Sequence, residues 1–205
     1  MTLPSFITLL RPDPGETTAV GTLGPPGTSS EVAATLLAHR LATPGDAAAP
    51  VHLFDTYEEA GAALHARRVT HVVVANAYKA VHHFYMDAAL DLSDVFVMDT
   101  PLYGIAVRCD AGPVPVSPTI ASHPSPVPII DQLLPRRHTS YKVIHSDSTS
   151  AAARAAVEGT ADLALTTVPA AQAHGLKFIS RTRPIRMVWS VFTRQRRPGR
   201  GGRAA

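Results

Sequence analysis

Hydroxyl side chains gather at three points of this sequence where a helix is expected to begin. The first turn of a helix has unpaired backbone N–H groups and the positive end of the helix dipole, and hydroxyls add neutral donors. Such a start can bind carboxylates or phosphates, although Ser and Thr also cap helices without any ligand. Three of them favour a small ligand with several negative charges. The candidate binding residues are Thr28, Ser29 and Ser30, then Ser125 in "SHPSP", then Ser148, Thr149 and Ser150 in "SDSTS".

Residues 76–86 hold a set of side chains that could move a proton. An imidazole can give or take a proton near neutral pH, and a phenol can donate one. If the segment is helical, several of these groups fall on neighbouring positions of one face. A packed aromatic helix with surface histidines is the alternative. The polar residues of the segment are Asn76, Tyr78, Lys79, His82, His83 and Tyr85.

A cation that could pair with a carboxylate stands at Arg108, the last residue of the apolar stretch "YGIAVR". An arginine at a strand end in a cleft can hold a carboxylate by two hydrogen bonds, and an exposed strand end is the alternative. The ten histidines show no His-x-x-x-His spacing, and the single Cys109 lies beside Asp110, whose charge opposes thiolate formation. We therefore expect neither a metal ion nor a cysteine nucleophile.

The elements that must position these groups alternate between short apolar runs and helix-like segments. This alternation predicts an α/β fold with a mainly parallel sheet. The expected strands are residues 19–23, 51–54, 71–75, 94–99, 102–108, 119–123, 141–145, 162–166, 176–180 and 186–192. The expected helices are residues 29–41, 57–67, 79–90, 126–134, 149–159 and 168–174.

The proline-rich stretch 109–118 divides this pattern into two α/β lobes. We expect lobe 1 to span about residues 18–105 and again 176–193, and lobe 2 to span about residues 106–175. The chain would then cross twice between the lobes and leave a cleft between them. Ligands of open α/β sheets bind at the carboxyl ends of strands, where helices begin, so the cleft is the expected site.

Composition places the chain among ordinary globular proteins, with 45% hydrophobic and 17% charged residues in a total of 205. Five of the 19 Lys and Arg residues lie after Thr193, where no acidic residue occurs, so residues 1–193 hold 14 basic against 16 acidic residues. This distribution argues against nucleic-acid binding, and residues 194–205 are expected to form a disordered basic tail. Because neither a transmembrane run nor a signal peptide is found, we expect a cytoplasmic protein.

Longer blocks of the sequence resemble the catalytic domain of prephenate dehydratases, over nearly the whole chain except its ends. These blocks are "GPPGTSSEVAA", "ASHPSP", "SDSTSAAARAAVEGTADLALT" and "HGLKFIS". Dehydratases carry a Thr-Arg-Phe signature whose threonine is generally taken to help the ring hydroxyl leave, but the corresponding region here reads "RPIRMVWSVF". The sequence more closely resembles the prephenate decarboxylases of antibiotic biosynthesis, of the bacilysin type. That resemblance is carried by "TLGPPGTSSE", "AYKAVHHFYM", "DTPLYGIAVR", "SHPSP" and "MVWSVF".

The resemblance implies a catalytic domain over residues 1–193 with a two-lobed, periplasmic-binding-protein-like fold of type II. It implies no metal and no organic cofactor. The implied reaction is loss of CO2 from prephenate without aromatisation, giving a dihydro-4-hydroxyphenylpyruvate in secondary metabolism. Prephenate is then the expected partner, with no nucleic acid and no membrane, and a homodimer stays open. Two alternatives also stay open: a dehydratase that gives phenylpyruvate, and a non-catalytic binding protein on the same scaffold.

The resulting mechanistic hypothesis assigns a role to each candidate residue. Helix starts and hydroxyls hold the two carboxylates of prephenate, and Arg108 pairs with the pyruvyl carboxylate. His83 or Tyr85 lies near the ring and delivers a proton to a ring carbon. Trp189, beside Met187, forms an apolar wall that helps to desolvate the departing carboxylate. Asn76, Tyr78 and His123 complete the expected substrate-binding residues.

Overall fold

The computed structural model describes residues 5–10, 17–42, 45 and 47–195, so the expected basic tail lies almost wholly outside the described residues. The strands are β1 (Ser5–Thr8), β2 (Val20–Leu23), β3 (Val51–Phe54), β4 (His71–Ala75), β5 (Leu90–Asp99), β6 (Tyr103–Arg108), β7 (Thr119–Ser122), β8 (Lys142–His145), β9 (Leu163–Thr167), β10 (Leu176–Phe178) and β11 (Arg186–Arg194). The helices are α1 (Ser29–Leu41), α2 (Tyr57–His65), α3 (His82–Met86), the 3-10 turn η1 (Val127–Ile129), α4 (Ile130–Leu133), α5 (Thr149–Val157) and α6 (Val168–Ala173).

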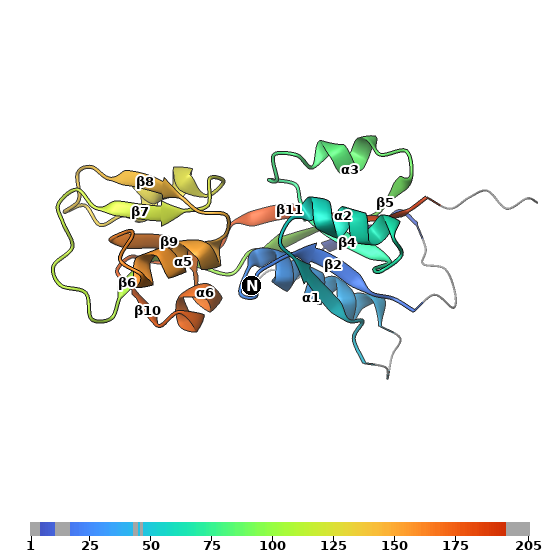
Figure 1. Ribbon diagram of the computed structural model, residues 1–205, viewed down its shortest axis with the longest axis horizontal. Coiled ribbons are helices and arrows are strands. Elements are labelled where there is room, and N and C mark those ends of the chain that lie inside the picture. The colour runs from blue at the N-terminus through green and yellow to red at the C-terminus, as the bar shows by residue number, and fades with distance from the viewer. Residues whose placement is uncertain (1–4, 11–16, 43–44, 46, 196–205) are drawn as a thin grey trace, which may run out of the picture.

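These strands form two sheets, and each sheet is the centre of one lobe (Figure 1). Lobe 1 contains the sheet β1-β5-β11-β4-β2-β3 with helices α1, α2 and α3. Lobe 2 contains the sheet β10-β6-β9-β7-β8 with helices α4, α5 and α6. The two-lobed α/β architecture predicted from the alternating pattern is therefore confirmed.

The crossings between the lobes do not fall where the sequence pattern puts them. The chain enters lobe 2 between β5 and β6, and returns to lobe 1 between β10 and β11. Strand β6 pairs with β9, and β10 pairs with β6, so both belong to lobe 2 rather than to lobe 1. The proline-rich stretch 109–118 is thus a connection within lobe 2. Apolar patterning identifies a strand but does not encode which sheet the strand joins.

Strand direction differs from the prediction as well. Strand β2 runs parallel to β3 and β4, and β7 runs parallel to β8 and β9. The remaining pairs are antiparallel, including those that place β11 between β4 and β5. Both sheets are therefore mixed, because the strands that connect the lobes enter each sheet from the opposite direction to its parallel core.

Two of the expected helices are much shorter than predicted. The segment 79–90 forms a helix only at α3, and residues 76–81 are turns. The segment 126–134 is split into η1 and α4, and no side chain caps η1. Pro126 and Pro128 disfavour a regular helix in the second segment, whereas residues 79–90 contain neither Pro nor Gly and their shortening has no local explanation in the sequence. Helix α1, in contrast, has the predicted bounds.

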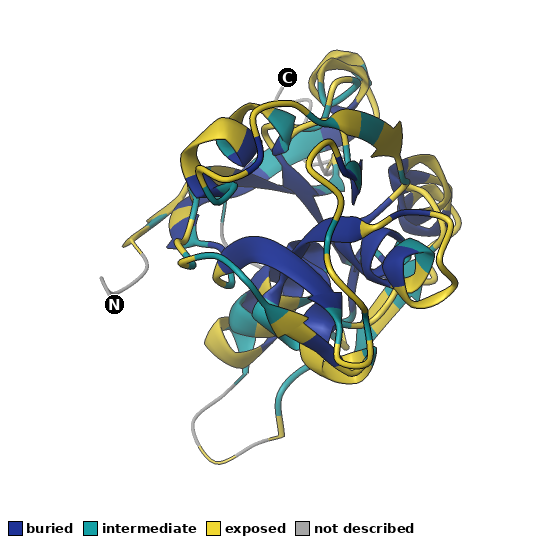
Figure 2. Ribbon diagram, turned by 90° about the vertical axis from the view of Figure 1, so that its left-hand side faces the viewer, coloured by how far each residue is buried: buried dark blue, intermediate teal, exposed yellow. Residues whose placement is uncertain are grey.

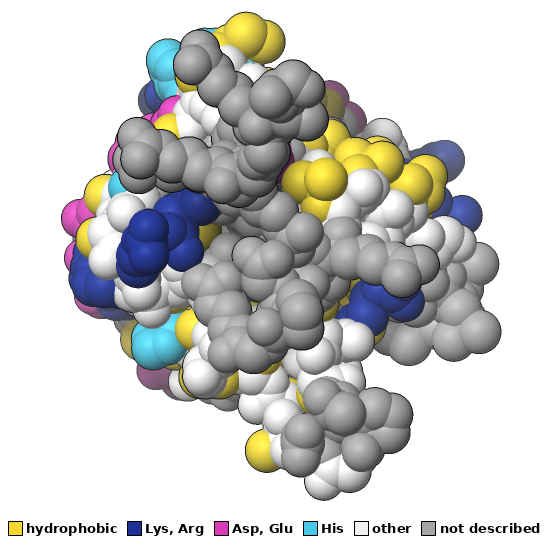
Figure 3. Space-filling model, turned by 90° about the vertical axis from the view of Figure 1, so that its right-hand side faces the viewer, with side chains coloured by type: hydrophobic (Ala, Val, Ile, Leu, Met, Phe, Trp, Pro, Cys, Tyr) yellow, Lys and Arg dark blue, Asp and Glu magenta, His cyan; other side chains and the backbone are white. Residues whose placement is uncertain are grey.

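The buried residues lie on the sheets and on the inner faces of the helices that cover them (Figure 2). On the face at the lobe 1 end, the visible Lys and Arg side chains form separate groups rather than one continuous stripe (Figure 3). Within the described residues, no helix is both long enough and apolar enough to cross a bilayer.

Candidate active site

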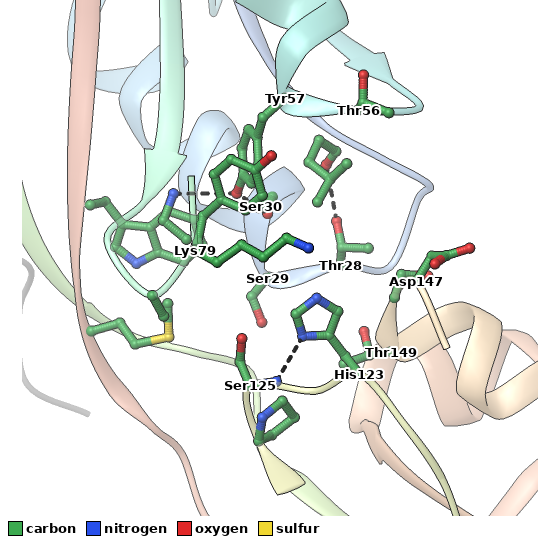
Figure 4. A pocket seen from close by; sticks show the side chains of 18 of the residues that line it. Thr28, Ser29, Ser30, Thr56, Tyr57, Lys79, His123, Ser125, Asp147 and Thr149 are labelled. Atoms are coloured by element: carbon green, nitrogen blue, oxygen red, sulfur yellow. Dashed lines mark hydrogen bonds between the residues drawn. The ribbon is translucent and has the colours of Figure 1, made fainter. Parts of the chain in front are cut away.

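A cleft of about 750 Å³ lies between the lobes and is lined by residues from both (Figure 4). Lobe 1 contributes the starts of α1 and α2, the turn that follows β4, and the first residues of β11. Lobe 2 contributes the start of β6, the loop after β7 and the start of α5. The two helix starts rich in hydroxyls, at α1 and α5, thus border the same cavity from opposite lobes.

The start of α1 is fixed by a cap and by a glycine. The Thr28 hydroxyl accepts a hydrogen bond from the backbone N–H of Glu31 at 3.3 Å, and the Glu31 carboxylate accepts one from the N–H of Gly27 at 2.6 Å. Gly27 has φ +85°, a conformation that favours glycine. The Thr167 hydroxyl of lobe 2 donates to the Gly27 carbonyl at 3.3 Å. Plain capping therefore accounts for Thr28, and the turn also contacts the other lobe.

The next two hydroxyls of α1 pair with tyrosines that line the cleft. The Ser30 hydroxyl lies 2.8 Å from the Tyr57 hydroxyl, and the Ser29 hydroxyl lies 3.4 Å from the Tyr103 hydroxyl. Burial raises the pKa of Tyr57 and the pKa of Tyr103, so both phenols stay neutral and are weak acids.

A third tyrosine in the cleft is a weak acid for a related reason. Burial, together with a short hydrogen bond to the Glu58 carboxylate, raises the pKa of Tyr78 to about 12. The same hydrogen bond lowers the pKa of Glu58. The Tyr78 hydroxyl thus donates its hydrogen bond to Glu58 and is poorly suited to give the proton to a ligand.

The start of α5 has one capping hydroxyl and one without a partner. The Ser148 hydroxyl accepts from the N–H of Ala151 at 3.0 Å, whereas the Ser150 hydroxyl turns away from the cleft to His174, at 2.9 Å. Among the described side chains, Thr149 Oγ1 and Trp189 Nε1 are buried polar atoms without a hydrogen-bond partner, and both residues line the cleft. Buried polar groups are nearly always paired, so these two atoms point to a ligand or ordered water that would satisfy them.

Lys79 supplies a positive charge at the cleft from the turn after β4 (Figure 4). Within the described residues it forms no ion pair, because the acidic side chains that border the cleft, Asp55, Glu58 and Asp147, all lie beyond ion-pair distance from it. Across the part of the chain that is described, no group of three or more His, Cys, Asp or Glu residues could hold a metal ion. Among the described residues that line the cleft, Lys79 and several neutral donors could bind an anionic ligand, and the three carboxylates lie at the same cavity.

His123 enters the cleft from the lobe 2 loop after β7, between Ser125 and Thr149 (Figure 4). The backbone N–H of Ser125 donates to His123 Nδ1 at 3.2 Å. Burial lowers the pKa of His123, and the nearby charge of Asp147 acts in the opposite direction. The ring is therefore neutral at neutral pH, with its proton on Nε2 because Nδ1 is an acceptor.

The structure brings most of the predicted site residues together and separates five of them from the cleft. Those that line the cleft are Thr28, Ser29, Ser30, Tyr78, His123, Ser125, Ser148, Thr149 and Trp189. Those that do not are Asn76, His83, Tyr85, Arg108 and Ser150.

Arg108 lies at the wrong end of its strand for the predicted carboxylate pairing. Tyr103, at the start of β6, lines the cleft, and five residues of extended chain place Arg108 roughly 17 Å further away. Its guanidinium lies 3.4 Å from the Asp110 carboxylate instead. The prediction failed because a strand has two ends, and the sequence does not show which end faces the cleft.

His83 and Tyr85 lie on α3, behind the wall of the cleft rather than in it. The Tyr85 hydroxyl lies 2.5 Å from the Ser190 hydroxyl, which in turn donates to Asn76 Oδ1 at 2.7 Å. His83 is exposed, and the centroid of its ring lies 4.3 Å from the centroid of the His82 ring. These residues do not reach the ligand space, because residues 76–81 form turns and the expected helical face does not exist. Asn76, behind the wall, is instead part of this hydrogen-bond chain.

The predicted set omitted Lys79, Tyr57 and Tyr103, which the structure places in the cleft. Lys79 was among the titratable side chains of its segment, and its position directly after a buried strand was the available signal. Tyr57 follows Asp55 and Thr56 at the predicted start of α2, and its position between a strand and a helix start was the corresponding signal. Tyr103 gives no such signal, because it begins a strand.

Comparisons with known proteins agree with this architecture. The family model described as prephenate dehydratase matches residues 20–183. A prephenate decarboxylase from Planktothrix agardhii is 40% identical over 179 residues, which cover 86% of this chain and 88% of that protein.

Solved structures support the fold alone, because their sequences are distant. A prephenate dehydratase from Arthrobacter aurescens, in complex with L-Phe, superposes with a TM-score of 0.65 at 14% identity. The match covers 90% of this chain and 63% of that one. A periplasmic substrate-binding protein of an ABC transporter from Coxiella burnetii gives a TM-score of 0.53 at 14% identity, over 86% of this chain and 84% of its own. The expected likeness to periplasmic binding proteins is thereby confirmed.

Proposed function

Because the chain belongs to the prephenate dehydratase family and is homologous to prephenate decarboxylases, we propose that it removes CO2 from prephenate without aromatising the ring. The product is a dihydro-4-hydroxyphenylpyruvate that keeps the ring hydroxyl, made for a secondary metabolite. Support comes from the 40% identity to a protein named prephenate decarboxylase over nearly the whole of both chains.

The proposed reaction and dehydration consume the same reactants. In both, the bond between the ring and its carboxylate breaks, CO2 leaves, and the electron pair moves into the cyclohexadiene. Both also consume one proton. When the proton goes to the hydroxyl, water leaves and the ring becomes aromatic; when it goes to a ring carbon, the hydroxyl stays. The enzyme therefore determines the product by controlling where one proton is delivered.

The observation that carries the proposal is that two capped helix starts, one from each lobe, border one cleft. Prephenate has two carboxylates, and each can be met by one helix start and its hydroxyls. The unpartnered Thr149 hydroxyl is available at the start of α5, and Lys79 adds a positive charge from lobe 1. We assign the role that Arg108 was expected to play to Lys79.

The titratable groups of the cleft support retention of the hydroxyl. Expelling a hydroxyl requires a group that hydrogen-bonds to it and gives it a proton as the bond breaks. Tyr57, Tyr78 and Tyr103 all have raised pKa values, so each is a weaker acid than an ordinary tyrosine, and each hydroxyl already pairs with a side chain of the protein. The apolar side chains of Ile185, Met187 and Trp189 provide a wall for the ring. A ring carbon becomes strongly basic as CO2 departs, and it can then take a proton from a weak acid or from water.

An assay with purified protein and prephenate tests the proposal. We expect CO2 release with a non-aromatic product whose mass retains the oxygen of the hydroxyl. Phenylpyruvate, which has a distinct absorbance and a mass lower by one water, would instead identify a dehydratase. Bound but unchanged prephenate would identify a binding protein. Because prephenate aromatises on its own in acid, the assay runs at neutral or basic pH beside a sample without enzyme.

A further inference from the structure

Among the described residues that line the cleft, one is a histidine, His123. Its surroundings disfavour the protonated ring that a proton donor would need. It directly follows β7, in the sequence His123-Pro124-Ser125-Pro126. The prolines on both sides of Ser125 restrict the backbone there. The N–H of Ser125 is thus held in place, and it donates to His123 Nδ1 at 3.2 Å.

This hydrogen bond opposes protonation of the ring. A protonated imidazole carries hydrogen on both nitrogens, so Nδ1 would have to give up its role as acceptor and would face a second donor. Burial disfavours the charged form as well and lowers the pKa of His123. The hydrogen bond and the burial therefore act in the same direction.

The charged groups around His123 come from both lobes. On lobe 2, Asp147 favours a protonated ring, and His145 disfavours it. From lobe 1, Lys79, Asp55 and Glu58 border the same cleft, where the lysine opposes a second positive charge and the two carboxylates favour it. A bound dianion would favour protonation, so only a direct constraint on the ring could keep it neutral. The N–H of Ser125 is such a constraint.

We propose that the Ser125 N–H holds His123 as a neutral donor, whose Nε2–H binds an oxygen of the substrate without transferring its proton. Figure 4 shows the ring of His123 in the cleft, with its other nitrogen turned away from Ser125. In this role the imidazole binds and orients prephenate but is not the acid that would expel its hydroxyl. The proposal rests on the proposed function and assigns His123 to binding and orienting the substrate.

Substitutions that separate donation from titration test it. His123→Gln keeps an N–H donor that cannot be protonated, whereas His123→Leu removes the donor. His52→Gln, on the exposed strand position of β3, is the matched control. We expect kcat/KM of His123→Gln to stay within about tenfold of the unsubstituted protein and His123→Leu to fall by a further 10-fold or more, about the worth of one hydrogen bond to a charged group. The product should keep its hydroxyl in both variants.

Equal losses in His123→Gln and His123→Leu would overturn the proposal, because they would show that a titrating imidazole is needed. Near-native activity of His123→Leu would overturn it too. The ¹⁵N shifts of His123 in the unsubstituted protein with phenylpyruvate bound provide a test that does not depend on variants. A neutral Nε2–H form between about pH 6 and pH 8 supports the proposal, and a doubly protonated ring there contradicts it.

These tests are distinct from the test of the proposed function. If the unsubstituted protein releases no CO2 from prephenate, the decarboxylase assignment fails whatever the state of His123. If it releases CO2 and keeps the hydroxyl while His123 is doubly protonated in the complex, the decarboxylase assignment stands and the role of His123 is wrong.

Discussion

The two lobes cover their sheets with side chains of different size. The core of lobe 1 contains large buried residues, among them Leu37, Phe96, Trp189 and Phe192. Lobe 2 has a comparable group of Ile and Leu on one side, but the cluster beneath α5 and α6 consists of nine alanines and one leucine. Small side chains let a helix lie close to a sheet, so α5 is placed by close backbone approach. In lobe 1, alanines of α1 and α2 pack together with large aromatic and aliphatic side chains.

The same contrast extends to the cleft. Lobe 1 presents its cation, Lys79, on a turn, beside tyrosines that are tied to other side chains. Lobe 2 presents neutral donors, His123 and the start of α5, on elements that pack closely. We infer that Lys79 is the charged contact of lobe 1 with the proposed substrate and that lobe 2 contributes neutral contacts that orient it.

The largest expected effect is on the core of lobe 1. Phe192 is 1% exposed and packs against Phe84 and Tyr85, so Phe192→Ala should lower the free energy of unfolding by about 3–5 kcal/mol. The control is Val188→Ala on the same strand, where the side chain is 38% exposed and the loss should be below about 1 kcal/mol. Denaturant unfolding followed by circular dichroism measures both. Equal losses would show that the buried Phe192 contributes no more to the core of lobe 1 than an exposed position of the same strand.

The division of roles across the cleft predicts the next effect. Lys79→Met should lower kcat/KM for prephenate by about 10–100-fold, because a donor to a charged group is lost. Lys142→Met, at an exposed position of β8 outside the cleft, is the matched control and should leave kcat/KM within about twofold. Steady-state assays at two salt concentrations measure both. Native kinetics for Lys79→Met would show that neutral donors alone hold the substrate.

The alanine cluster predicts a smaller loss from added volume. Ala153 is fully buried on α5, so Ala153→Leu should cost about 1–3 kcal/mol of the free energy of unfolding. It should also displace the start of α5 and raise KM more than it lowers kcat. Val157→Leu, at a 39% exposed position of the same helix, tests whether leucine itself is harmful there. Unchanged stability in Ala153→Leu would mean that the helix is not closely packed.

The smallest expected effect concerns pH. Because the Tyr78 hydroxyl lowers the pKa of Glu58, this pair contributes stability above the ordinary glutamate pKa of about 4.3 and loses it as pH falls through the lowered value. In Tyr78→Phe the pKa of Glu58 should rise toward its ordinary value. Since Glu58 is exposed, the accompanying change in stability should be well below about 1 kcal/mol. Carbon NMR titration of the carboxyl group measures the shift, and an unmoved pKa would contradict the prediction.

Local chemistry explains what the sequence could and could not predict. Helix α1 and its cap follow from Gly27 and Thr28, since capping depends only on neighbouring residues. Arg108 and β10 were misplaced because strand direction and sheet membership depend on contacts between distant segments. His83 and Tyr85 were assigned to a site by helical spacing in a segment that is mostly turn. The unpartnered Thr149 hydroxyl becomes visible only once burial is known.

Trp189 has a consequence beyond its place in the wall of the cleft. It is the one tryptophan in the sequence, it is 1% exposed, and its indole stacks on Phe96 with ring centroids 6.5 Å apart. All tryptophan fluorescence of this protein therefore originates from a single point beside the proposed substrate. Binding, release and any change in the separation of the lobes can be followed through that intrinsic emission, in the unmodified chain and without an added dye.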